Sequence, residues 1–134
     1  MTKRRDCEER FRERYRAPVS EAALVVEREV IGANVGANGY TTVGQADMLA
    51  ERLGLGVGNV LLDIGSGRGW PALYLSAKTG CRAVLTDLPE PALSSALGRA
   101  DNQHLRSASV VRASATHLPF KTDTFDVITH TDTL

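Results

Sequence analysis

The sequence has few cysteines and few aromatic residues, and no excess of charge of either sign. Of its 134 residues, 2 are cysteines and 5% are aromatic, while 16 basic side chains balance 16 acidic ones. Two thiols in unrelated contexts do not make a Cys/His cluster, so no metal site is predicted. A net charge of zero offers no general attraction to nucleic acid or to an anionic membrane, and neither is expected as a partner.

Long hydrophobic runs are also missing. No stretch approaches the roughly 20 apolar residues that a membrane-spanning helix needs. The first 16 residues carry seven basic and four acidic side chains instead of the apolar segment of a secretory signal. We therefore expect a cytoplasmic protein. Phe11 and Tyr15 are four residues apart, so this charged segment is interpreted as a solvated helix with one small apolar contact, rather than as a nucleic-acid-binding arm.

Two further helices are predicted before residue 58. Ser20 can cap a helix through EAALVVEREVI, which Gly32 ends. Thr42 and Gln45 have the spacing of a capping box, which opens a second helix over VGQADMLAERL. Between them lies GANVGANGYTT, a loop that is unusually long for a simple connection.

Strand and helix patterns alternate from residue 60 onward. The predicted helices cover 70–79 and 89–103, and the apolar runs predict strands at 60–64, 82–87, 107–114 and 125–130. This alternation is typical of a parallel sheet covered by helices. The predicted fold class is α/β, a Rossmann-like doubly wound parallel sheet with N-terminal helices.

The segment LLDIGSGRG joins the first predicted strand to a glycine-rich turn. Gly65, Gly67 and Gly69 would let a ligand approach the backbone closely. Asp63 stands at the lip of this turn, at the carboxyl end of a strand, where open α/β sheets bind ligands. Asp87 ends the second strand, where a carboxylate can accept hydrogen bonds from a ribose diol. Two helix-capping carboxylates are the alternative interpretation.

A nicotinamide dinucleotide site is the rival interpretation of the glycines. Its Gly-x-Gly-x-x-Gly motif needs glycine or alanine where this chain has Trp70. The carboxylate of Asp63 would also repel a pyrophosphate, whereas it suits a ligand with a cationic group. An oxidoreductase of this type is therefore disfavoured.

These residues resemble the class I S-adenosylmethionine-dependent methyltransferases that act on small molecules. LLDIGSGRG is similar to the first motif of that family, VLTDLP to the acidic end of its second strand, and ASATHLPFKTDTFDVITHTDTL to its third and fourth strand region. The resemblance covers residues 36–134. It implies the strand order 3-2-1-4, S-adenosyl-L-methionine as cofactor, and methyl transfer to a small-molecule acceptor.

The resemblance also implies roles for the matched residues. Asp63 would hold the ammonium group of the cofactor, Asp87 the ribose hydroxyls, and the glycines would bring the ligand against the backbone. Leu88 would pack on the adenine. Ser114 stands where the family commonly has an aspartate, so recognition of the adenine amino group is expected from Ser114 and from the backbone around Ala115.

His130 and Tyr40 are the candidates for contact with the reacting groups. His130 ends the fourth predicted strand, near the methyl group in the resembled family, and would act as a general base only if the acceptor must lose a proton. A plain wall residue is the alternative. Tyr40 lies in a segment that resembles the family's cofactor lid, with an ordinary loop as the alternative. We therefore divide the chain into an N-terminal helical cap and cofactor lid, 1–58, and a truncated cofactor-binding half, 59–134.

The resemblance stops after the fourth strand, whereas the family continues through three more. The fourth strand would then be an edge that invites pairing with a second copy or a partner chain. A gene fragment, a split enzyme and a self-completing oligomer remain open, as does a non-catalytic S-adenosylmethionine- or nucleotide-binding module. We expect the chain alone to associate through this strand or to be poorly stable, with little methyl transfer.

Overall fold

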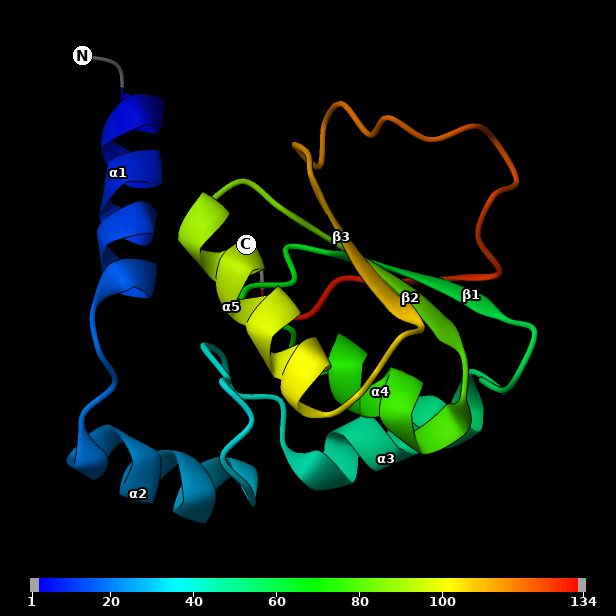
Figure 1. The fold of residues 1–134 in the computed structure, drawn as a ribbon, viewed down its shortest axis with the longest axis horizontal. Coiled ribbons are helices and arrows are strands. Elements are labelled where there is room, and N and C mark those ends of the chain that lie inside the picture. The colour runs from blue at the N-terminus through cyan, green and yellow to red at the C-terminus, as the bar shows by residue number, and fades with distance from the viewer. Residues whose placement is uncertain (1–2, 133–134) are drawn as a thin grey trace.

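A computed structural model describes residues 3–132 as four strands and five helices (Figure 1). The predicted N-terminal part, 1–58, and the predicted cofactor-binding half, 59–134, each extend two residues beyond this range. Residues 1, 2, 133 and 134 lie outside the described residues. In chain order the elements are α1 Lys3–Arg16, α2 Glu21–Ile31, α3 Val43–Arg52, β1 Val60–Ile64, α4 Ala72–Thr79, β2 Arg82–Asp87, α5 Glu90–Asn102, β3 Ala108–Arg112 and β4 Val127–Thr129.

The strands form one parallel sheet in the order β3-β2-β1-β4, which confirms the predicted order. The register places Asp63 of β1 opposite Leu85 on one side and Thr129 of β4 on the other. Parallel strands end at a common edge, so Asp63, Thr129 and Asp87, the last residue of β2, all lie near the carboxyl edge of the sheet.

The helices of the N-terminal part begin and end where the sequence predicts. The hydroxyl of Ser20 accepts a hydrogen bond from the N–H of Ala23, and Gly32 ends α2 with a φ of 106°. Thr42 and Gln45 form the reciprocal bonds of a capping box at the start of α3. Both local predictions are confirmed, because each depends on short-range geometry that the sequence alone specifies.

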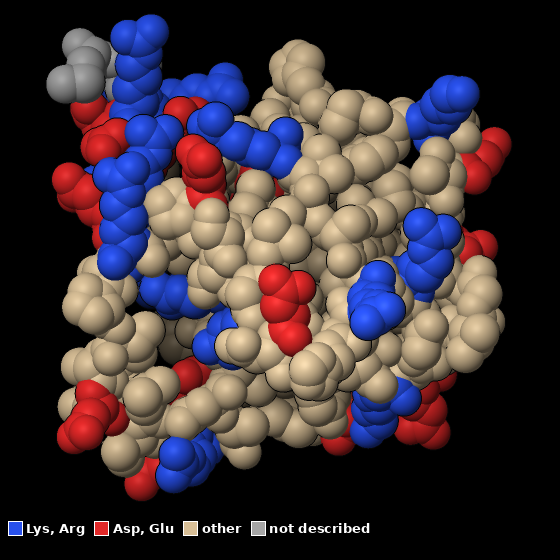
Figure 2. Space-filling view, in the orientation of Figure 1, with Lys and Arg blue, Asp and Glu red and all other residues tan. Residues whose placement is uncertain are grey.

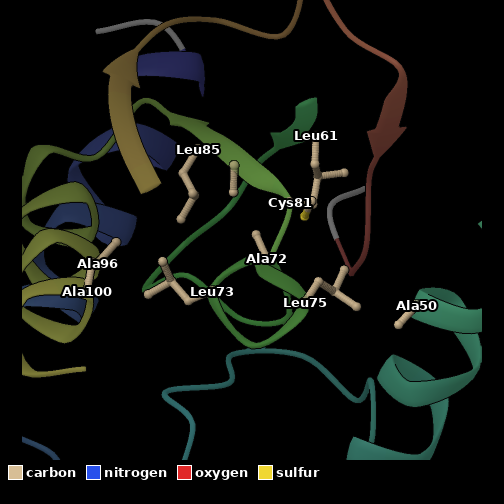
Figure 3. Close-up of a cluster of buried hydrophobic side chains, with 10 residues drawn as sticks. Ala50, Leu61, Ala72, Leu73, Leu75, Cys81, Leu85, Ala96 and Ala100 are labelled. Atoms are coloured by element: carbon tan, nitrogen blue, oxygen red, sulfur yellow. The ribbon is translucent and has the colours of Figure 1, made fainter. Parts of the chain in front are cut away.

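The main core lies between the sheet and the helices α3, α4 and α5 (Figure 3). Leu61 of β1 and Leu85 of β2 pack in one cluster with the apolar face of α4, and alanines let α5 approach closely. Each fully buried leucine side chain stabilises the fold by roughly 1.5–3 kcal/mol relative to its exposure. The cluster contains Ala50, Leu61, Ala72, Leu73, Leu75, Cys81, Ala83, Leu85, Ala96 and Ala100.

The predicted fourth strand, 125–130, is too long. Pairing is confined to Val127–Thr129. On one side Asp126 turns its carboxylate back to accept the N–H of Val60 at 2.8 Å, and on the other the chain bends at Asp132, which has a φ of 54°. The exposed apolar edge is therefore short, with Ile128 59% exposed.

Helix α1 lies at the periphery. Figure 1 shows it beside α5 and away from the sheet, and it contributes no buried residue. None of the helices in the part of the chain that the structure describes is both long and apolar enough to cross a membrane.

Candidate cofactor site

A pocket of about 550 Å³ opens at the carboxyl edge of the sheet. The turn after β1 and the residues that follow β2, β3 and β4 form its inner walls. Helix α1 and the loop at 36–39 form its outer wall. The inner lining consists of Ile64, Gly65, Ser66, Gly67, Arg68, Trp70, Asp87, Leu88, Pro89, Ala113, Ala115, His130, Thr131 and Asp132.

The glycine turn has the backbone geometry that its sequence predicts. Gly65, Gly67 and Gly69 have φ values of 70°, 54° and 100°, in the left-handed region that favours glycine. The carbonyl of Thr86 accepts the N–H groups of Gly65 and Ser66, both at 2.9 Å, which ties the turn to β2. Gly69 does not line the pocket. An added Cβ at this position would lie 2.5 Å from a side-chain carbon of Leu73, so glycine is needed here for close packing of the turn against α4.

Asp87 connects the glycine turn to the end of β2. One of its carboxylate oxygens accepts the N–H of Gly67 at 2.8 Å, and the other accepts the N–H of Leu88 at 2.8 Å. A carboxylate oxygen has two lone pairs, so each can accept a further hydrogen bond from a ligand. The side chain lines the pocket.

The prediction that Asp63 lies at the lip of the turn is wrong. Asp63 lies beneath the turn, with 1% of its surface exposed. Its Oδ1 accepts a hydrogen bond from the hydroxyl of Thr129 at 2.7 Å, while Oδ2 has no partner. Burial raises the pKa of Asp63 to about 7, against the effect of the Thr129 bond, and the charge of Asp87 adds to the rise. The hydroxyl of Ser66 is buried without a partner as well. Unpartnered buried oxygens of this kind fit a ligand that donates hydrogen bonds.

The structure brings only some of the other predicted residues into the pocket. Leu88, Ala115 and His130 line it. Ser114 does not, because its hydroxyl turns to that of Thr116 at 2.9 Å. Tyr40 also stays outside the lining and is 83% exposed.

Sequence reasoning missed the contribution of α1. Six of its residues line the pocket, and their spacing places them on one helical face. The four-residue interval between Phe11 and Tyr15 was the available signal, but it predicted only a small apolar contact. The six are Arg4, Cys7, Glu8, Phe11, Arg14 and Tyr15.

Tyr15 is the point at which α1 meets the glycine turn. An added Cβ on Gly67 would lie 2.9 Å from the Tyr15 hydroxyl, and the guanidinium carbon of Arg68 lies 5.0 Å from the centre of the Tyr15 ring. Burial raises the pKa of Tyr15, and the nearby charge of Asp87 adds to this effect. The tyrosine is therefore neutral at the edge of the pocket.

Side chains from several elements hold the loop that forms the rest of the outer wall. One carboxylate oxygen of Glu27 accepts the N–H groups of Val35 and Ala37, at 3.0 and 2.8 Å. The indole N–H of Trp70 donates to the carbonyl of Thr41 at 2.8 Å. Within residues 3–132, no group of three or more His, Cys, Asp or Glu side chains is placed to hold a metal ion.

Comparison with known proteins identifies the fold that carries this site. The model of the methyltransferase domain family matches residues 62–134, more than half of the chain. The chain belongs to this family. The predicted methyltransferase family and its fold are thereby confirmed. The predicted cofactor, S-adenosyl-L-methionine, is the one present in a solved structure of the same fold.

Similar proteins come from distant organisms. Methyltransferase GfsG of Streptomyces halstedii is 36% identical over 83 residues, which are 61% of this chain and 30% of that protein. A phosphoethanolamine N-methyltransferase of Haemonchus contortus, solved with S-adenosyl-L-methionine, has a TM-score of 0.69 and 21% identity over 90% of this chain and 28% of its own. A SAM-dependent methyltransferase of Aquifex aeolicus has a TM-score of 0.61 and 18% identity, over 92% of this chain and 55% of its own.

This methyltransferase domain spans 30% and 21% of the lengths of the two curated relatives that it matches. The family match, residues 62–134, contains the glycine turn and the carboxyl ends of β1, β2 and β4.

Proposed function

We propose that this chain binds S-adenosyl-L-methionine at the carboxyl edge of its sheet and serves methyl transfer to a small-molecule acceptor. The observation that carries the proposal is the unpartnered Oδ2 of Asp63, a buried carboxyl oxygen beneath a left-handed glycine turn. Asp63 lies behind the pocket lining, so a cationic amino group above this turn would reach that oxygen only after a local shift of the turn, and would then favour the ionised carboxylate.

The remaining residues would each bind a different part of the cofactor. Asp87 would accept the ribose hydroxyls through the free lone pairs of its carboxylate, and Gly65 and Gly67 would admit the ligand to the backbone. Leu88 and Ala115 would pack against the adenine from the lining that they already form. Ser114 would contribute through its backbone, because its hydroxyl is bonded to Thr116.

When bound, the cofactor supplies an electrophilic methyl group on a sulfonium. The task of the protein is to align the acceptor with that group and to exclude water. His130 lines the pocket at the end of β4 and is the residue that we propose to face the acceptor, as a general base where the acceptor carries a proton. The exposed Tyr40 would reach the pocket only after a rearrangement of its loop.

We also propose that residues 1–58 act as the cap and lid and residues 59–134 as the cofactor-binding half. The lining from α1 and from the 36–39 loop supports this division. A cytoplasmic location remains a proposal that cell fractionation would test.

A second candidate function is that of a cofactor-binding module completed by another copy or a partner chain. Within residues 3–132, β4 is an edge strand of the sheet and its Ile128 is 59% exposed, which supports this candidate. Such a module would bind the cofactor but transfer methyl groups only after association.

Calorimetry with S-adenosylmethionine, S-adenosylhomocysteine and NAD tests the cofactor proposal directly. We expect binding of both sulfur compounds and none of NAD, with Asp63→Asn as the variant that loses the ammonium contact. Tight NAD binding without either sulfur compound would refute the proposal. Methyl transfer from radiolabelled cofactor, measured with the chain alone and after cross-linking its oligomers, separates the enzyme from the module.

A further inference from the structure

The acidic side chains that line the pocket already have partners. Glu8 forms an ion pair with Arg4 at 3.5 Å. Asp87 accepts two backbone N–H groups, and Asp132 accepts the N–H and hydroxyl of Thr41. Each carboxylate is thus hydrogen bonded or ion paired within the protein.

Two basic side chains of the lining have no carboxylate partner. Arg68 donates to the amide oxygen of Asn38 at 3.0 Å and to the backbone carbonyl of Arg14 at 3.5 Å, and its plane lies over the Tyr15 ring. The guanidinium of Arg14 makes no ion pair or hydrogen bond with any other residue of the range 3–132. The α1 end of the pocket therefore holds two guanidinium groups without an anion.

A third arginine adds to the positive potential behind this wall. An added Cβ on Gly36 would lie 2.6 Å from the guanidinium carbon of Arg99, so Arg99 packs directly on the loop that lines the pocket. Burial lowers the pKa of Arg99, an effect that Glu27 opposes and the charge of Arg68 reinforces. Glu27 itself is engaged by the N–H groups of the same loop. Figure 2 shows Lys and Arg side chains gathered over α1, at the upper left.

We propose that Arg14 and Arg68 form an anion-binding subsite for a carboxylate or phosphate group at the α1 end of the pocket. Guanidinium groups bind both anions through paired N–H donors, and a ligand charge would replace the missing carboxylate partner. The inference deepens the proposed function, on which it rests for the identity of the pocket. The anion that we propose is an acidic group of the methyl acceptor.

Two variants and a matched control test the subsite. Arg14→Gln and Arg68→Gln each remove one charge from the lining, whereas Arg10→Gln removes one from the same helix outside it. The probes, measured by calorimetry, are inorganic pyrophosphate, S-adenosylhomocysteine and the decarboxylated form of S-adenosylhomocysteine. We expect both lining variants to weaken pyrophosphate binding by about tenfold, and Arg10→Gln to leave it within twofold of the unaltered chain.

The nucleoside probes identify the source of the anion. If the cofactor carboxylate occupies the subsite, the lining variants weaken S-adenosylhomocysteine by about tenfold, leave its decarboxylated form unchanged, and pyrophosphate competes with the former. If the acceptor supplies the anion, both nucleosides keep their affinities, and pyrophosphate binds to the loaded protein through the same arginines. The second result supports the proposal. The first overturns it, because the two arginines then hold the cofactor itself.

The proposal is overturned if pyrophosphate and S-adenosylhomocysteine bind all four proteins equally, or if Arg10→Gln loses as much affinity as Arg14→Gln. Failure of the proposed function looks different. In that case neither nucleoside binds, while pyrophosphate affinity still depends on Arg14 and Arg68.

Discussion

The carboxylate of Asp132 accepts two hydrogen bonds from Thr41, one from its backbone N–H at 3.2 Å and one from its hydroxyl at 2.6 Å. Although burial alone would raise the pKa of Asp132, the bonds from Thr41 and from the Tyr40 backbone hold it below its usual value. An added Cβ on Gly39 would overlap the Asp132 side chain, so the two segments lie in direct contact. The glycine-rich loop is thus fixed to the end of β4 in this conformation, and opening it requires that these bonds break.

Replacement of Asp132 is predicted to release this loop. Asp132→Ala should accelerate limited proteolysis within residues 33–41 and lower the free energy of unfolding by about 1 kcal/mol, since the pair is largely exposed. Asp132→Asn retains one acceptor and should have a smaller effect. The exposed Asp101→Ala serves as the control, and a loop that is cleaved equally fast in Asp132→Ala and in the control would contradict the prediction.

Replacement of Asp87 is predicted to weaken cofactor binding. Asp87→Ala should reduce the affinity for S-adenosylhomocysteine by about 2–3 kcal/mol, the scale of charge-assisted hydrogen bonds to a diol. Calorimetry measures the loss, and circular dichroism checks that the turn still folds, because Gly67 also depends on this carboxylate. An unchanged affinity in a folded variant would show that other groups bind the diol.

The raised pKa of Asp63 predicts that the stability of the ligand-free chain falls as pH rises. The unfolded chain ionises this carboxyl near its ordinary value of 3.8, whereas the folded chain retains the proton until about pH 7. The folded state therefore binds more protons between these values. The stabilisation that the protonated carboxyl gives the folded state is complete below the lower pKa and is lost as pH rises through about 7. The free energy of unfolding should fall by on the order of 3 kcal/mol between pH 5 and 8.

Thermal unfolding across this range measures the effect, with Asp63→Asn as the variant that should show a much flatter profile. Cofactor binding should have the opposite dependence. A cationic ammonium group favours the ionised carboxylate, so affinity should increase through pH 7. A profile for Asp63→Asn that declines as steeply as that of the unaltered chain would assign the pH dependence to other groups.

The exposed side chain on β4 predicts association through that strand. Ile128→Lys places a charge on the free edge and should shift the chain toward monomer in light scattering at high concentration. Val57→Lys alters an apolar residue that is even more exposed, at 89%, but lies outside the strands. Equal effects of the two substitutions would indicate unspecific contacts in place of edge pairing.

Local patterns predicted much of the fold. The caps at Ser20 and Thr42 and the strand order follow from turn chemistry and alternating elements, which act over a few residues or through a familiar topology. The ends of β4 could not be predicted from local patterns. They depend on Asp126 bonding to Val60 and Asp132 to Thr41, contacts between residues 66 and 91 positions apart.

The candidate site could be predicted only in part for the same reason. Asp87, Gly65 and Gly67 lie where their motif places them, because strand ends in a parallel sheet converge. The burial of Asp63 and the packing role of Gly69 depend on neighbours in β4 and α4 that no local pattern specifies. The wall formed by α1 was visible only as a helical face, without any indication of what that face would meet.

Helix α1 lines a large part of the pocket yet buries none of its own residues. We therefore expect substitutions on its inner face to change ligand binding more than folding, since the core between the sheet and the helices contains no residue of α1. The α1 side of the pocket should therefore tolerate substitution with little loss of stability, whereas Asp87 should not, because its carboxylate also holds the glycine turn through Gly67.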